Sequence, residues 1–251
     1  MANYSIYFSP TGGTKKVADI IAANLTGEYK GIDLCKDIEP MRIGKEDICL
    51  ISVPSYGGRV PETALDRLKK IDGNGAVAVL NCVYGNRAWE DTLTELQDVL
   101  ESIGFTCVAA VAAVAEHSIF RQFASGRPDT EDAAELGTFA AQIQVKLDRG
   151  ETAMPELAGS HGTYKEYNGT PFKPEGDERC TGCGLCADEC PVCAIDPQEP
   201  SSNDKEKCIS CMRCISICPT HARDFNPDYM KELGEQKAPV LGGHKNNYLF
   251  I

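Results

Sequence analysis

Short apolar runs recur along the first 150 positions and alternate with segments in which apolar residues return every three or four positions. The runs have the length of strands, and the intervening segments have the spacing of helices. The last of these helices is expected to begin at Asp129 or Thr130, because acidic residues follow in its first turn. Strands that are apolar on both faces are typical of a parallel sheet covered by helices on both sides. The pattern predicts an α/β fold whose five strands lie in residues 3–8, 32–34, 48–53, 76–83 and 105–115.

The periodic pattern ends near residue 150 and divides the chain into two domains. Glycine, proline and polar residues take over in residues 150–176, which indicates a linker. Its three aromatic side chains exceed what a freely solvated tether needs, so we expect the linker to pack between the domains. A first domain therefore spans residues 1–149, and a second, smaller domain spans residues 177–226. Residues 227–251 form a tail, with a short helix at its start and an apolar end that is expected to pack against one of the two domains.

The most informative feature of the second domain is a cysteine pattern that occurs twice, with its first cysteines at positions 180 and 208. Each copy reads Cys-x-x-Cys-x-x-Cys-x-x-x-Cys-Pro. Three thiolates spaced in this way wrap one tight turn of backbone around an iron–sulfur cluster, and in this run the fourth cysteine binds the other cluster. The expected ligand sets are Cys180, Cys183, Cys186 and Cys218 for one cluster, and Cys208, Cys211, Cys214 and Cys190 for the other.

Other uses of these cysteines fit the pattern less well. Zinc knuckles also employ Cys-x-x-Cys pairs, but four zinc ligands per site leave the third cysteine and the proline without a role. Thirteen cysteines with no secretory signal favour a reducing, cytoplasmic environment over a disulfide framework. Cys193 forms a further Cys-x-x-Cys with Cys190, but the repeat aligns Cys193 with His221, so Cys190 is the expected ligand. Over about residues 175–226 the pattern resembles bacterial-type ferredoxins with two [4Fe-4S] clusters.

Three loops that follow predicted strands of the first domain carry residues suited to a phosphate and a flat ring. Open parallel sheets bind ligands outside the carboxyl ends of their strands. The first loop offers hydroxyl groups and glycines that can close around a phosphate at a helix N-terminus; the alternative is a tight turn capped by Thr14. The candidate residues are Ser9, Thr11, Gly12, Gly13 and Thr14 in the first loop, Pro54, Ser55, Tyr56, Gly57, Gly58 and Arg59 in the second, and Asn81, Tyr84, Gly85, Asn86, Arg87 and Trp89 in the third.

Together the three loops resemble the flavodoxin pattern. The resemblance implies a doubly wound sheet of strand order 2-1-3-4-5, with the phosphate of FMN in the first loop and its ring between the other two. Pro10 and Gly13 depart from typical flavodoxins, in which hydroxyl residues or asparagine are common. Trp89 either stacks on the flavin or lies in the core. A long connection over residues 116–128 either reaches a substrate or the second domain through His117 and Arg121, or forms only local surface contacts.

The whole chain resembles the flavodoxin/ferredoxin fusion proteins of anaerobic bacteria. The resemblance implies an electron-transfer flavoprotein in which FMN and two [4Fe-4S] clusters exchange electrons with redox protein partners. One alternative is a reductase whose quinone-like or unsaturated organic substrate stacks on the flavin, and another is a redox sensor. No catalytic residue is assigned, and whether the protein is an enzyme stays open. The net charge of −12 speaks against nucleic acid as a partner, and no apolar run reaches membrane-spanning length.

Overall fold

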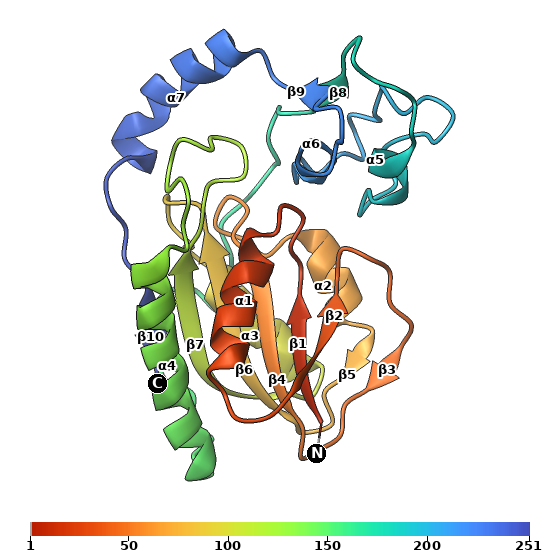
Figure 1. The fold of residues 1–251 in the computed structure, drawn as a ribbon. Coiled ribbons are helices and arrows are strands. Elements are labelled where there is room, and N and C mark those ends of the chain that lie inside the picture. The colour runs from red at the N-terminus through yellow and green to blue at the C-terminus, as the bar shows by residue number, and fades with distance from the viewer. Residues whose placement is uncertain (1) are drawn as a thin grey trace.

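The computed structural model describes residues 2–251, and its centre is a six-stranded sheet of order β10-β7-β6-β4-β1-β2 (Figure 1). All its neighbouring strands are parallel except the edge pair of β10 and β7. Without β10, the order in the chain is 2-1-3-4-5, which is the doubly wound order of flavodoxin-like folds. The predicted fold class and strand order are therefore confirmed. The five parallel strands are β1 (Asn3–Tyr7), β2 (Tyr29–Asp33), β4 (Ile48–Pro54), β6 (Val77–Tyr84) and β7 (Thr106–Val114).

Helices cover both faces of this sheet, because its central strands β4, β6 and β7 are apolar on both sides. On one face, α1 (Gly13–Ala23) and α4 (Thr130–Asp148) pack their apolar residues on Leu50 and Val79. On the other, α2 (Glu62–Leu68) and α3 (Thr92–Ser102) pack on alternate side chains of the same strands. Each fully buried Leu or Ile stabilises the fold by about 1.5–3 kcal/mol. Two short strands, β3 (Met41–Arg42) and β5 (Ile71–Asp72), form a separate parallel pair.

Helix α4 begins where the sequence predicts. The Asp129 side chain accepts hydrogen bonds from the backbone N–H groups of Glu131 and Asp132, and the Asp132 side chain accepts one from the Asp129 N–H at 2.9 Å. This reciprocal cap satisfies N–H groups that have no partner within the helix. A cap of this kind stabilises a helix by about 1 kcal/mol.

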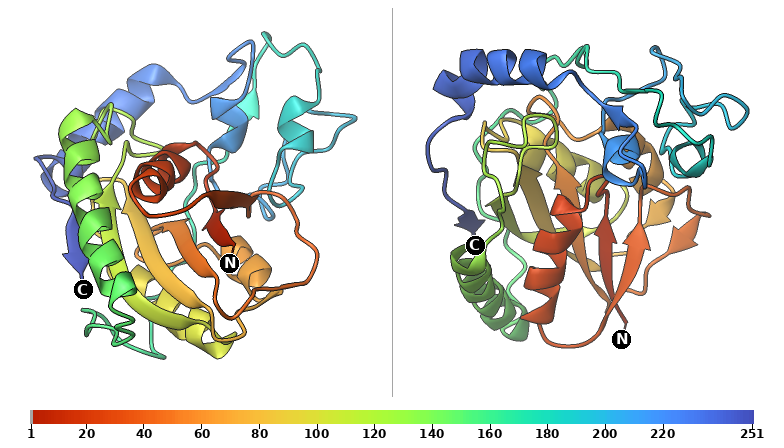
Figure 2. Two further views of the ribbon diagram at one scale, coloured as in Figure 1. Left: turned by 60° about the horizontal axis from the view of Figure 1, so that its bottom comes forward. Right: turned by 45° about the horizontal axis from the view of Figure 1, so that its top comes forward.

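The tail of the chain returns to the first domain. Helix α7 (Pro227–Leu241) runs from the second domain to the β7 side of the sheet, where β10 (Tyr248–Phe250) pairs antiparallel with β7 (Figure 2). This helix is longer than the short one predicted at the start of the tail. Just before β10, Asn247 accepts a hydrogen bond from the Val114 N–H at 2.9 Å and donates to the carboxylates of Asp132 and Glu135. The second domain is thus joined to the first at both of its ends.

The second domain lies over the carboxyl ends of the parallel strands (Figure 1). Its regular elements are short and come in pairs. Helix α5 (Leu185–Asp188) and helix α6 (Arg213–Ser216) occupy equivalent positions in the two cysteine copies, and β8 (Glu175–Gly176) pairs antiparallel with β9 (Arg223–Asp224). Among residues 2–251, no helix is both long and apolar enough to cross a membrane.

Candidate functional site

The two cysteine copies have the same backbone geometry as well as the same spacing. Left-handed backbone occurs at Gly182 and at its equivalent Ser210, with φ of 69° and 56°, and again at Gly184 and its equivalent Met212, with φ of 77° and 62°. A residue other than glycine costs about 1–2 kcal/mol in this conformation. Ser210 and Met212 adopt it in a buried part of the molecule, whereas their glycine counterparts lie nearer the surface. The backbone reversal that brings the thiols of one copy together is therefore present in both.

The fourth cysteine of each copy also has equivalent surroundings. The Ala194 N–H donates to the Cys190 Sγ at 3.3 Å, and the Ala222 N–H donates to the Cys218 Sγ at 3.3 Å. Hydrogen bonds of this kind favour a thiolate and tune an iron–sulfur cluster. Cys193 is exposed and has the backbone conformation of its repeat counterpart His221, with φ of 50° and 51°.

Four cysteines from both copies line one small enclosed cavity in the second domain. Burial raises the pKa of the Cys211 thiol well above its usual range and that of Cys214 to about 11. A thiol with such a raised pKa stays neutral at pH 7 unless a metal replaces its proton. The donor set and its enclosure therefore fit an iron–sulfur group. The four cysteines are Cys190, Cys208, Cys211 and Cys214.

The other predicted set lies nearer solvent. Cys183 is exposed, and Cys180, Cys186 and Cys218 are half-buried. Burial opposes ionisation of Cys218, but hydrogen bonds from Thr220 and from backbone N–H groups hold the pKa of its thiol below the usual value. Among residues 2–251, no group of three or more His, Cys, Asp or Glu side chains is arranged to hold a single metal ion.

The first of the three predicted loops lies between β1 and α1 and leaves backbone N–H groups free at the start of the helix. Gly12 is the N-cap, with φ of 91° and no side-chain cap, so the helix is not capped by Thr14. The Ser9 hydroxyl accepts from the Lys15 N–H at 2.8 Å and fixes the loop. The N–H groups of Gly13 and Thr14 have no acceptor among the described residues. Donors of this kind at a helix N-terminus fit a phosphate group.

The structure brings the three predicted loops together around one cavity, and the loop after β7 completes its wall. This cavity, called the strand-end cavity below, has a volume of about 70 Å³. Small-molecule sites usually measure about 300–1,000 Å³, so this cavity has room for a phosphate as the side chains stand but is smaller than a whole flavin ring needs. The predicted residues that line it are Thr11, Gly13, Thr14, Pro54, Ser55, Tyr56, Tyr84 and Gly85.

Several other predicted residues lie beside this cavity and support its loops. Arg59 forms an ion pair with Glu95, and its guanidinium lies 5.0 Å from the centre of the Tyr164 ring. Arg87 pairs with Glu90 at 2.8 Å. The remaining contacts are those of Asn81, which donates to the Ser52 hydroxyl at 3.0 Å, and of Asn86, which donates to the backbone carbonyls of Leu241 and Gly243.

The second loop has two glycines because neighbouring side chains lie against its backbone. A Cβ on Gly57 would lie 2.1 Å from a ring carbon of Tyr167, and a Cβ on Gly58 would lie 2.0 Å from the Glu90 carboxylate. Both glycines also have positive φ. The aromatic residues of the linker thus pack on the first domain, and Tyr167 covers the second loop.

Trp89 belongs to an aromatic cluster under the last strand. Its ring centre lies 5.1 Å from that of Tyr84, 5.0 Å from that of Tyr248 and 6.4 Å from that of Phe250. Of the two alternatives that the sequence leaves open, the structure favours packing at the core. The cluster depends on β10, whose position the sequence does not predict.

His117 also lines the strand-end cavity, although it lies outside the three predicted loops. Its Nδ1 accepts from the N–H groups of Ile119 and Phe120, at 3.1 and 3.2 Å, so we assign the ring proton to Nε2. Burial, assisted by the nearby Arg87, lowers the pKa of His117 to about 4. The ring is neutral at pH 7 and offers a hydrogen-bond donor. Arg121, by contrast, pairs with Glu116 on the surface.

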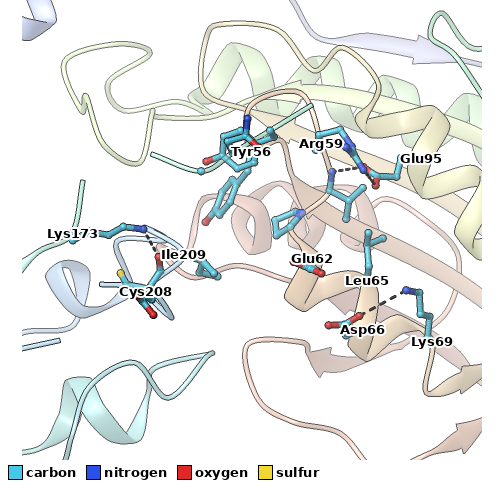
Figure 3. A pocket seen from close by; sticks show the side chains of 16 residues that line it. Tyr56, Arg59, Glu62, Leu65, Asp66, Lys69, Glu95, Lys173, Cys208 and Ile209 are labelled. Atoms are coloured by element: carbon cyan, nitrogen blue, oxygen red, sulfur yellow. Dashed lines mark hydrogen bonds and ion pairs between the residues drawn. The ribbon is translucent and has the colours of Figure 1, made fainter. Parts of the chain in front are cut away.

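A second, larger cavity of about 530 Å³ lies between α2, the linker and the second domain (Figure 3). Tyr56 lines it as well as the strand-end cavity, and Cys208 lines it as well as the cysteine cavity. The Lys173 ammonium donates to the Cys208 carbonyl (Figure 3). Burial raises the pKa of Tyr56 far above its usual value, and the nearby thiols of Cys211 and Cys35 raise it further.

Comparisons with family models support the assignment of the second domain. Residues 177–193 and 203–224 match family models described as 4Fe-4S binding domains, and these two segments contain all eight predicted ligands. No curated protein matches the chain.

Among solved structures, the chain is similar to a flavodoxin of Streptococcus pneumoniae TIGR4, with 19% identity, a TM-score of 0.43 and coverage of 58% of this chain and 99% of that one. Flavodoxin 1 of Bacillus cereus has 19% identity, a TM-score of 0.41 and coverage of 57% and 97%. Rubredoxin oxygen:oxidoreductase of Desulfovibrio gigas has 17% identity, a TM-score of 0.43 and coverage of 61% and 37%. By its own strand order and its matched segments, the chain is a fusion of a flavodoxin-like domain with ferredoxin-type 4Fe-4S binding domains.

Proposed function

We propose that this protein passes single electrons between two [4Fe-4S] clusters and FMN, and on to a redox protein partner. One observation carries the proposal. The strand-end cavity, the larger cavity and the cysteine cavity are neighbours in series, because Tyr56 lines the first two and Cys208 lines the last two. Side chains of the two domains therefore meet between the places where the two kinds of cofactor would bind.

The residues divide into two groups under this proposal. The cysteines of the two sets supply the cluster ligands, and the free N–H groups of Gly13 and Thr14 bind the phosphate of FMN. Tyr56 and Tyr84 flank its ring, and His117 donates a hydrogen bond from Nε2. A cubane passes one electron and a flavin accepts one or two, so the pair converts between one-electron and two-electron chemistry.

Cofactor analysis tests the proposal directly. Protein purified without oxygen should contain about one FMN and about eight irons, because the chain has two complete sets of four cysteine ligands. The measurement combines iron, sulfide and zinc analysis with identification of the released flavin. Protein that holds zinc in place of iron, or that binds no flavin when reconstituted with FMN, contradicts the proposal.

A second candidate function is a reductase for a small organic molecule. The cavity of about 530 Å³ has the size of a small-molecule site, and Tyr56, Val60, Leu65 and Ile209 give it ring and aliphatic surface. A quinone-like substrate there would take electrons from the same cofactors. Stopped-flow reduction of the flavin by a one-electron donor, with and without clusters, separates the two functions. Equal rates favour a reductase that is supplied directly at the flavin, and a much slower rate without clusters favours the relay.

A further inference from the structure

We infer that the two cluster sites have different places in the relay. The site formed by Cys190, Cys208, Cys211 and Cys214 is the inner one, which faces the strand-end loops across Tyr56. The site formed by the other cysteine set is the outer one, where a one-electron redox protein exchanges electrons with the molecule. This inference rests on the proposed function and adds to it the order in which the two cluster sites lie between the partner and the first domain.

The first observation is that two loops of equal sequence spacing have opposite exposure. In the second copy, Cys211 is 9% exposed and Met212 is 2% exposed. In the first copy, the equivalent Cys183 is exposed and the equivalent Gly184 is half-buried, and the next residue, Leu185, is 39% exposed. The difference arises because the second copy packs against the first domain, where Ile209 lies on the hydrophobic core.

The second observation is that polar contacts fasten the inner set to the first domain. Arg67 of α2 donates to the Pro191 carbonyl at 2.6 Å, next to Cys190. Lys36 forms an ion pair with Glu189, on the other side of the same cysteine. Both contacts cross from one domain to the other, so the segment that supplies the fourth ligand of the inner set is held in place.

Arg213 forms a third link, from the loop that carries the other three ligands. It pairs with Glu189, and its Nη1 donates to the Pro10 carbonyl at 3.4 Å, within the proposed phosphate loop. The hydrogen bonds that the structure gives for residues 180–186 and 218–222 stay, by contrast, within the second domain. The inner set is thus tied to the first domain at every segment, and the outer set is not.

Tyr56 occupies the space between the inner set and the strand-end cavity. Its hydroxyl lies near the thiols of Cys211 and Cys35, and across the larger cavity it faces Cys208 and Ile209 (Figure 3). Electron tunnelling slows steeply with distance and with empty space, so a ring that lines the cavities on both sides shortens the path. Tyr56 is therefore a positioning residue for electron transfer.

The outer set offers a surface for a protein partner. Cys183 and Leu185 are exposed there, and the carboxylates of Glu178 and Asp188 lie nearby in the chain and are exposed too. An apolar spot with acidic residues around it fits a partner with a basic rim. With both clusters and FMN bound, the partner would give up one electron at the outer set, the inner set would pass it on, and two such transfers with two protons from solvent would reduce the flavin fully.

A matched pair of full-length variants tests this order. Cys211→Ala removes one inner ligand, and Cys183→Ala removes the equivalent outer ligand. The readout is the ³¹P relaxation rate of bound FMN in fully reduced protein, where the clusters are paramagnetic and the flavin is not. Because relaxation falls with the sixth power of distance, Cys211→Ala should lose most of the enhancement, and Cys183→Ala should keep most of it. The reverse result overturns the order while leaving the proposed function intact.

Electron paramagnetic resonance of the wild-type protein supplies a second measurement that needs no variant. A soluble dysprosium chelate should shorten the relaxation of one reduced cluster and leave the other nearly unchanged. Equal effects on both clusters contradict an inner and an outer site. Absence of iron or of FMN from the wild-type protein contradicts the proposed function itself, so the two failures are distinguishable.

Tyr56→Phe and Tyr56→Leu test the positioning role. The phenylalanine variant keeps the ring and should transfer electrons to the flavin at close to the wild-type rate. When both variants are saturated with FMN, the leucine variant should slow this step while its iron content and its urea midpoint stay near those of the phenylalanine variant. Equal flavin reduction rates in the two variants overturn the role of the ring.

Discussion

Arg127 and Asp132 form a buried ion pair with two hydrogen bonds, and only 8% and 4% of their side chains are exposed. Arg127 also donates to the Lys245 carbonyl at 2.6 Å, and Asp132 accepts from Asn247 at 2.9 Å. The pair therefore connects the start of α4 to the segment that leads into β10. It fastens the tail of the chain to the first domain.

Removal of one partner of this pair should be strongly destabilising. Asp132→Asn leaves the Arg127 guanidinium buried without a counter-charge, which costs about 3–5 kcal/mol. Urea unfolding of the full chain measures the effect as a lower midpoint. Asp148→Asn, on the exposed end of the same helix, is the matched control and should change the free energy of unfolding by less than about 0.5 kcal/mol. A similar small change for both variants would show that the pair contributes little.

The same pair predicts a loss of stability in acid. Burial opposes ionisation of Asp132, but Arg127 and other hydrogen-bond donors lower its pKa from 3.8 to about 2. A carboxyl whose pKa is lower in the folded state stabilises the protein above its unfolded pKa, and this stability is lost as the pH falls from about 4 to about 2. The contribution is about 2 kcal/mol. The urea midpoint of wild type should fall more steeply in this window than that of Asp132→Asn.

The lowered pKa of His117 predicts that the stability of the fold also depends on pH in a higher range. Its pKa is about 4 in the folded protein and 6.5 ordinarily, so the unfolded chain binds the proton more tightly. Stability should therefore decrease as the pH falls from 6.5 towards 4. In His117→Asn the side-chain oxygen can still accept from Ile119 and Phe120 but does not titrate, so this decrease should be smaller. His244→Asn, at an exposed position, should behave as wild type does.

Cys190 and Cys193 separate the two possible ligand assignments. Cys190 lines the cysteine cavity and receives a backbone hydrogen bond, whereas Cys193 is exposed. Cys190→Ser should lose the cluster that it shares with Cys208, Cys211 and Cys214, and Cys193→Ser should keep both. Iron content and low-temperature electron paramagnetic resonance measure the difference. Greater iron loss in Cys193→Ser would reverse the assignment.

Trp89 is the only tryptophan and therefore reports on β10. A chain that ends before Tyr248 removes two rings of its cluster, so Trp89 should become more accessible to water. We expect its fluorescence maximum to shift to longer wavelength and its quenching by iodide to increase. Tyr229→Ala, at an exposed position of α7, should change neither. An unchanged spectrum of the shortened chain would show that β10 does not cover Trp89 in solution.

The sequence predicts β4, β6 and β7 well because burial on both faces leaves a continuous apolar run in each. The edge strand β2 has no such run, and the range predicted for it, 32–34, is displaced from the observed Tyr29–Asp33. The sequence predicts the start of α4 for a similarly local reason, since the cap at Asp129 uses residues within three positions. The strand β10 has three residues, and its partner β7 lies more than 130 positions earlier in the chain. Nothing local marks such a strand, so its pairing, and with it the surroundings of Trp89, could not be predicted.

In the candidate site too, features set by local sequence could be predicted, and features set by packing between distant segments could not. Residues expected to bind through backbone groups, such as Gly13, are predicted from loop composition, and the two proposed ligand sets are predicted from the cysteine spacing. The directions of long side chains depend on what packs beside them. Arg59 extends to Glu95 and the linker, and Arg213 reaches Pro10 only because the domains are docked. Docking of the two domains also explains why the first cysteine copy lies at the surface and the second in the interior.

The position of β10 after the cysteine repeat also bears on how the protein is made. The five parallel strands leave the ribosome first, and β7 stays an open sheet edge until β10 follows. With β7 ending at Val114 and β10 beginning at Tyr248, this interval lasts on the order of ten seconds at ordinary rates of translation. An open edge can pair with other chains. Both cysteine copies emerge within the same interval, so a cell that is slow to supply iron and sulfide would accumulate chains whose second domain is unformed and whose sheet is still unsealed.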